Sequence, residues 1–129
     1  MHMTHLALWV QDLERLKAFY ETYFGVQATA KYVKMRTHFQ SYFLTFASGT
    51  RVELMQRPDI PPRATPPGQE CLGYAHLAMA VGSAAAVNAL TQRVVADGYP
   101  LLDGPRWTGD GDYASVLADP EGNRIEITV

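Results

Sequence analysis

The sequence predicts an α+β fold of two βαβββ modules, which form a curved mixed sheet with the helices on its outer face. Two observations lead to this prediction. Strand, helix and strand patterns follow in the same order in both halves of the chain. Each half also opens with a histidine at a strand and carries a glutamate in a later strand. The spacing is 71 residues from His5 to His76 and 73 residues from Glu53 to Glu126.

The first module begins with a strand at residues 5–10, where apolar residues alternate with others. Asp12 is a good N-cap, the next residues have helical spacing, and Gly25 is a typical stop for that helix. Residues rich in strand formers follow, separated by short turns. They predict three further strands, over residues 28–35, 39–47 and 51–55.

The second module repeats this order. Residues 74–81 predict a strand, and Ser83 caps a helix that ends near residues 97–98. Three further strands are expected, over residues 99–102, 113–118 and 124–129. Residues 57–70 hold five of the eight prolines, which favours a connecting segment. We therefore expect a single domain, 1–129, divided into module 1 at 1–56, a Pro-rich linker at 57–72 and module 2 at 73–129.

The bulk composition excludes some partners. The chain of 129 residues is 47% hydrophobic and 19% charged, as in ordinary globular domains. A net charge of -2 gives no electrostatic reason to bind nucleic acid or an anionic membrane. No apolar run approaches the ~20 residues that cross a bilayer. The N-terminus lacks signal-peptide features, and the single Cys71 cannot form an internal disulfide, so we expect a cytoplasmic protein.

The repeated histidines and glutamates are candidate metal ligands. Strand alternation places Glu53 and Glu126 opposite to the apolar residues that face the helices. A pseudo-twofold relation of the modules would bring His5, Glu53, His76 and Glu126 to one point. Two imidazoles and two carboxylates suit a divalent metal. For any single residue, a solvent-facing polar group is the commoner role.

Four motifs carry a family resemblance: HLALWVQDL at residues 5–13, FY to FG at 19–25, HLA at 76–78 and DPEGNRIE at 119–126. With them the chain resembles the vicinal oxygen chelate superfamily, which includes glyoxalase I, fosfomycin-resistance proteins, extradiol dioxygenases and bleomycin-binding proteins. The order His, Glu, His, Glu looks like glyoxalase I. The resemblance implies one divalent metal per site, which could be nickel, cobalt, zinc, manganese or iron, with Glu126 as catalytic base and Glu53 as the other candidate.

The implied activity is that of a metal-dependent lyase or isomerase acting on the thiohemiacetal of a 2-oxoaldehyde. Bacterial glyoxalase I tends to have Arg and Asn where this chain has Trp9 and Arg57, and those positions resemble glutathione contacts. The sequence therefore leaves two alternatives for the thiol part of the substrate: glutathione or another thiol. The alternatives are another metal-dependent enzyme of the superfamily, such as a thiol transferase or dioxygenase, and a non-catalytic protein that binds a small ligand.

The resemblance also implies a homodimer. In similar proteins of this length, modules from different chains pair, and the Pro-rich segment could permit that exchange. Each site would then take two ligands from each chain. Other residues could contact a small-molecule substrate, although core or edge packing is the commoner role for each aromatic residue, and a solvated strand-edge charge is at least as common for each arginine. They are the aromatic residues Trp9, Phe39, Tyr42, Phe43 and Tyr113 and the arginines Arg36, Arg51, Arg57 and Arg124.

Overall fold

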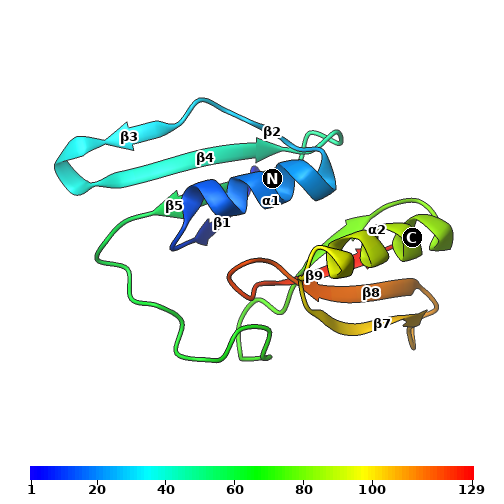
Figure 1. Ribbon diagram of the computed structural model, residues 1–129. Coiled ribbons are helices and arrows are strands. Elements are labelled where there is room, and N and C mark those ends of the chain that lie inside the picture. The colour runs from blue at the N-terminus through cyan, green and yellow to red at the C-terminus, as the bar shows by residue number, and fades with distance from the viewer. The chain divides into compact units, whose positions relative to one another are not determined.

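The computed structural model describes all residues, 1–129, and consists of two compact units, residues 1–63 and 64–129 (Figure 1). Each unit contains one sheet and one α-helix that packs on that sheet. The predicted α+β class with two βαβββ modules is confirmed, and the strands form two mixed sheets, one in each module.

Unit 1 has a sheet with the strand order β1-β5-β4-β2, and β3 also pairs with β4. Strands β1 and β5 are parallel, whereas the other pairs are antiparallel. The elements of this unit are β1 (Leu6–Trp9), α1 (Leu13–Phe24), β2 (Gln27–Ala28), β3 (Tyr32–Lys34), a short 3-10 turn (Met35–Thr37), β4 (Phe39–Thr45) and β5 (Arg51–Gln56).

Helix α1 forms where the sequence predicts it. The Asp12 carboxylate accepts a hydrogen bond from the Arg15 backbone N–H at 3.0 Å, which satisfies one free donor of the first turn. Gly25 ends the helix in the left-handed region with φ of 61°. The side of α1 that faces the sheet is apolar and buried, as its helical spacing requires. Its buried residues are Leu13, Leu16, Phe19 and Tyr20.

Unit 2 repeats this topology with the strand order β6-β9-β8-β7, and β6 and β9 are the parallel pair. Ser83 caps α2 by accepting a hydrogen bond from the Ala86 N–H at 3.2 Å. The elements are β6 (Leu77–Ala80), α2 (Ala84–Ala96), β7 (Leu101–Trp107), β8 (Tyr113–Ala118) and β9 (Arg124–Thr128). The equivalent strand order confirms that the two halves are copies of one supersecondary unit.

Three of the predicted strands differ from the structure by more than two residues at one end or are divided. The strand expected at 28–35 is divided into β2 and β3, because the Thr29 hydroxyl accepts the Phe43 N–H at 3.2 Å in place of a backbone carbonyl. The strand expected at 99–102 lies at 101–107 instead. It includes Gly104 and Pro105, which an edge strand tolerates at a bulge. The strand expected at 74–81 begins later, so His76 directly precedes β6.

The later part of the Pro-rich segment belongs to unit 2 and packs on the turn between β8 and β9. The Gly68 N–H donates to the Gly122 carbonyl at 3.0 Å, and Arg124 Nη1 donates to the Gly68 carbonyl at 2.8 Å. Gly122 has φ of 79°, and a Cβ at this position would overlap Pro67. A glycine is therefore required in the turn between β8 and β9, where this segment docks.

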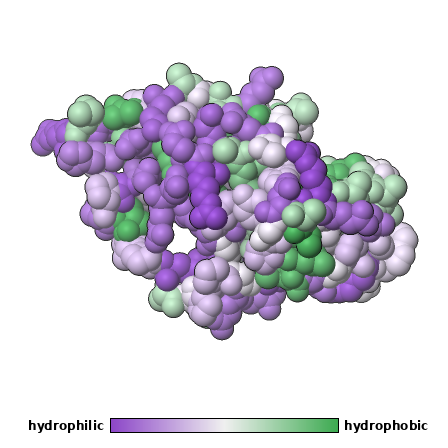
Figure 2. All heavy atoms as spheres, viewed as in Figure 1, coloured by the Kyte–Doolittle hydropathy of each residue, from purple (hydrophilic) through white to green (hydrophobic).

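Neither helix has the length and apolarity that a membrane crossing requires. On the face shown in Figure 2, hydrophilic residues surround smaller hydrophobic areas. The apolar residues of the two cores are instead inside the units, between each helix and its sheet. The largest fully buried side chains include Tyr20, Leu54, Leu117, Ile125 and Ile127.

Candidate metal half-sites

In unit 1, His5 and Glu53 lie next to each other on neighbouring parallel strands, and we call this pair half-site 1. The parallel register pairs Ala7 with Glu53. His5 comes two residues before Ala7, so its side chain points to the same face of the sheet as that of Glu53. His5 Nε2 lies 3.7 Å from Glu53 Oε2. The two side chains are 34% and 15% exposed, so both are accessible while held by the sheet.

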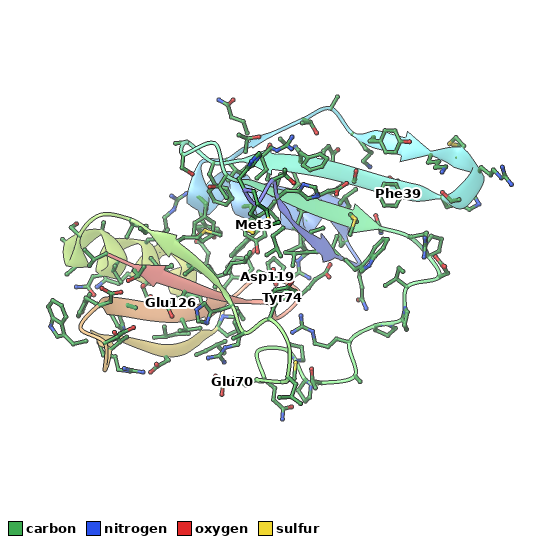
Figure 3. All side chains as sticks on the ribbon, turned by 180° about the vertical axis from the view of Figure 1, so that it is seen from behind. Met3, Phe39, Glu70, Tyr74, Asp119 and Glu126 are labelled. Atoms are coloured by element: carbon green, nitrogen blue, oxygen red, sulfur yellow. The ribbon has the colours of Figure 1, made fainter.

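In unit 2, His76 and Glu126 have the same arrangement, and we call this pair half-site 2. The register pairs Ala78 with Glu126, and His76 Nε2 lies 3.4 Å from Glu126 Oε2. Glu126 projects from β9, and Tyr74 lies on the segment that leads to His76 (Figure 3). Each unit thus brings its own histidine and glutamate together in the same arrangement.

Apolar neighbours in the same strands fix the direction of both glutamates. Val52 and Leu54 flank Glu53 and are buried, and Ile125 and Ile127 flank Glu126 in the same way. Because side chains alternate along a strand, burial of the flanking pair on the helix side directs each carboxylate to the opposite face. Rotation of a glutamate to the helix side would need a shift of the whole strand register.

Half-site 1 has further contacts that orient the imidazole. The Thr4 hydroxyl oxygen lies 3.0 Å from His5 Nδ1, and the Phe43 ring meets the imidazole edge-on with centroids 5.2 Å apart. When Nδ1 carries the proton and donates a hydrogen bond to Thr4, the lone pair of Nε2 is free to bind a metal. Nε2 is also the nitrogen nearer to Glu53. The sequence analysis did not identify Thr4. Its position directly before the histidine is the signal that could have found it.

The aromatic candidates divide between the two faces of their sheets. Trp9 and Phe39 lie on the face of half-site 1, with ring centroids 6.1 Å apart, and the Arg57 guanidinium lies 5.3 Å from the centre of the Trp9 ring. Tyr42 and Tyr113 have the packing role, which is the commoner of the two roles considered for each. Both point to the helix side, where Tyr42 donates to Glu14 on α1 and Tyr113 donates to Asn88 on α2.

Each half-site has one imidazole nitrogen and one carboxylate oxygen, two atom types that bind metals in proteins. No group of three or more His, Cys, Asp or Glu residues in the chain is arranged to hold a metal ion. Within each pair, however, the nitrogen and oxygen are closer than twice a metal–ligand distance of about 2.0–2.2 Å. One ion could therefore contact both atoms of a pair without large movement of either side chain.

Comparisons with known proteins agree with this architecture. The family model of the Glyoxalase/Bleomycin resistance protein/Dioxygenase superfamily matches residues 2–127. A curated relative, the uncharacterized protein PA2024 of Pseudomonas aeruginosa, is 31% identical over 137 residues, covering 98% of this chain and 86% of the relative.

Two solved structures illustrate the range of proteins with this fold. Trypanothione-dependent glyoxalase I of Leishmania major has a TM-score of 0.78 at 22% identity, over 99% of this chain and 86% of that chain. A mutant of the fosfomycin resistance protein FosX of Listeria monocytogenes, complexed with Mn(II) and 1S,2S-dihydroxypropylphosphonic acid, has a TM-score of 0.75 at 20% identity, over 98% of this chain and 90% of that chain. At such identities the likeness concerns the fold. From the match to its family model, the chain belongs to the Glyoxalase/Bleomycin resistance protein/Dioxygenase superfamily, the vicinal oxygen chelate family.

Proposed function

We propose that this protein is a metal-dependent lyase or isomerase of the glyoxalase I type, which acts on the thiohemiacetal of a 2-oxoaldehyde. The observation that carries the proposal is the presence of two equivalent half-sites, each with one imidazole and one carboxylate on neighbouring parallel strands. Two half-sites together offer two nitrogen and two oxygen donors. A reaction on adjacent oxygen-bearing carbons needs both an electrophile and a base, and this donor set can provide both.

The four proposed ligands are His5 and Glu53 from half-site 1 and His76 and Glu126 from half-site 2. Imidazole and carboxylate donors without thiolate suit nickel, cobalt, zinc, manganese or iron. When bound, such an ion supplies a Lewis acid that polarises the two neighbouring oxygens of the substrate. The mutant FosX complexed with Mn(II) supports a divalent ion in this fold.

The proposed base is a glutamate of the half-sites. Its carboxylate takes the proton from the carbon that bears sulfur and hydroxyl and returns it to the adjacent carbonyl carbon, while the hydroxyl proton moves to the former carbonyl oxygen, so that the product is the isomeric 2-hydroxyacyl thioester. We assign this role to Glu126. Its cross-strand neighbour is Val116, whereas Glu53 faces the larger ring of Phe43. The smaller neighbour leaves Glu126 more freedom to move between two positions, as a proton-transfer group requires.

We further propose a homodimer in which each site combines half-site 1 of one chain with half-site 2 of its partner. The support is the division of the ligands between two compact units, which separate within the Pro-rich segment between residues 63 and 64. Two ligand atoms are too few for a tetrahedral or octahedral metal centre. Each half-site therefore needs another half-site to complete the coordination of the metal. An alternative with the same ligands is a site built from both halves of one chain.

The test is product analysis with purified protein loaded separately with nickel, cobalt, zinc and manganese. Methylglyoxal is mixed with glutathione and, in parallel, with other thiols. The expected product is a 2-hydroxyacyl thioester, detected by mass spectrometry and by its ultraviolet absorbance. A variant with both Glu53 and Glu126 changed to Gln is the matched control and should be inactive. Metal-loaded protein that converts none of the thiohemiacetals would contradict the lyase assignment and favour another reaction of the superfamily.

A further inference from the structure

Arg51 lies beside half-site 1 and has no acidic partner. The parallel register of β1 and β5, continued by one residue, places it next to His5, and strand alternation places it on the face of Glu53. Its guanidinium carbon lies 4.7 Å from the centre of the Phe43 ring, the same ring that meets the His5 imidazole at 5.2 Å. Because both groups contact the same ring, the guanidinium carbon of Arg51 can lie no farther from the centre of the His5 imidazole than these two distances together.

The counterpart of Arg51 in unit 2 is used differently. Arg124 precedes Glu126 by two residues, as Arg51 precedes Glu53, and the register places it next to His76. Arg124 donates to the Gly68 carbonyl at 2.8 Å and lies 3.5 Å from a Glu70 carboxylate oxygen. Figure 3 marks Glu70 on the loop before β6. Arg124 is only 18% exposed, so its charge is committed to holding this loop.

The remaining arginine on the face of half-site 1 is also compensated. Arg57 stacks on Trp9, and its Nε donates to the Asp59 carboxylate. Arg51 is therefore distinct, because it is exposed, held over an aromatic ring and not neutralised by a carboxylate of the chain. A guanidinium in this state is suited to bind an external carboxylate through paired hydrogen bonds.

From this geometry we propose that Arg51 binds an anionic group of the substrate, a carboxylate on the part of the molecule that extends away from the two chelating oxygens. The inference rests on the proposed function and narrows its substrate class to oxygen chelates that carry a negative charge. Stacking on Phe43 restricts the guanidinium to a plane above the ring, so the position of the carboxylate relative to half-site 1 is defined. Arg51 is thus a specificity-determining residue and not a metal ligand.

The test uses two hydroxamic acids that chelate metal through adjacent oxygens. One carries a short alkyl tail that ends in a carboxylate, and the other carries the corresponding neutral carboxamide. Their dissociation constants are measured by calorimetry on nickel-loaded protein for a series of tail lengths. The wild type should bind the carboxylate at least about tenfold more tightly at the best length, as expected for a charge-assisted hydrogen bond.

Three variants separate this role from a general effect of charge. Arg51→Gln should lose the preference for the carboxylate while binding the carboxamide as the wild type does. Arg51→Lys should keep part of the preference. Arg15→Gln, which removes an exposed charge on α1, should keep all of it. Metal content, measured in parallel, should be unchanged in all three variants.

The outcomes distinguish this proposal from the proposed function. Equal affinity of the wild type for both probes, or a preference that persists in Arg51→Gln, overturns the role of Arg51 and leaves metal chelation intact. Failure of the metal-loaded wild type to bind either hydroxamic acid contradicts the chelating site itself, and the role of Arg51 with it.

Discussion

Removal of the Thr4 hydroxyl should weaken metal binding although Thr4 is not a ligand. The Thr4 oxygen lies 3.0 Å from His5 Nδ1. In the proposed site, His5 Nε2 must be free of a proton to bind metal, so Nδ1 carries the proton and donates to Thr4. In the Thr4→Ala variant the imidazole loses this partner, and both its tautomer and its ring orientation become less defined.

The magnitude follows from the exposure of this contact. A hydrogen bond between neutral groups contributes about 0.5–1.5 kcal/mol, and second-sphere partners of metal-bound histidines commonly change affinity about 10–100-fold. Thr4 is exposed, so water can replace part of the lost interaction. We therefore expect the dissociation constant for nickel to rise about three- to tenfold, which lies within the range for one hydrogen bond and at or below the lower end of the range of about 10–100-fold.

The assay is competition with a chromophoric chelator at neutral pH. Thr4→Ser keeps the hydroxyl and should bind metal as the wild type does. Thermal unfolding of the metal-free proteins should be the same for all three, since the side chain is exposed and contributes no core packing. An unchanged dissociation constant in Thr4→Ala, or an equal loss in Thr4→Ser, would refute the proposed orientation of His5.

Three further predictions concern the ligands, the ion pairs and the assembly. His5→Ala should lose most metal affinity, whereas Glu126→Gln should retain measurable metal but lose turnover. Metal content and activity are measured in parallel on both variants. Turnover at the wild-type rate by Glu126→Gln would show that Glu126 is not the base. The hydrogen bond from Lys31 lowers the pKa of the Glu14 carboxyl below its ordinary value of 4.5, so the stabilisation by ionised Glu14 is present above pH 4.5 and is lost as pH falls through the lowered value. Glu14→Gln should therefore lower the midpoint of thermal unfolding at pH 7 but not in strong acid, and an equal difference at both pH values would contradict the ion-pair explanation. Finally, a variant without half-site 1 and a variant without half-site 2 should regain part of their metal binding when mixed under conditions that permit subunit exchange, whereas no recovery after demonstrated exchange would show that each chain builds its own site.

The sequence was sufficient to predict the modules because local signals and periodicity agree in each of them. The Asp12 cap, the Gly25 stop and the alternation around Glu53 all describe interactions within a few residues, and the structure contains each of them. The division of the strand at 28–35 was not predictable. It depends on the Thr29 hydroxyl meeting Phe43, a residue 14 positions away whose register is set by the sheet.

The same reasoning explains which site contacts could be predicted. The repeat predicts that the two histidines and two glutamates lie together. Which histidine lies beside which glutamate depends on the parallel pairs β1–β5 and β6–β9, which the repeat alone does not indicate. Strand parity decides between the two roles considered for Tyr42 and Tyr113, a pocket position and the commoner packing role. Counting from the glutamate-facing partners on β4 and β8 puts both residues on the helix side. The difference between Arg51 and Arg124 depends on the loop at residues 67–70, which no local pattern indicates.

The central claim is that two half-sites together form one metal centre, and metal stoichiometry tests it most directly. Protein purified without chelators and then equilibrated with nickel is analysed by elemental mass spectrometry after removal of free ion. The wild type should retain about one ion per chain, because each chain supplies one copy of each half-site. The double variants His5→Ala with Glu53→Ala and His76→Ala with Glu126→Ala should each retain almost none. Wild-type protein that takes up no nickel, cobalt or zinc, or a double variant that keeps a full equivalent, would contradict the claim.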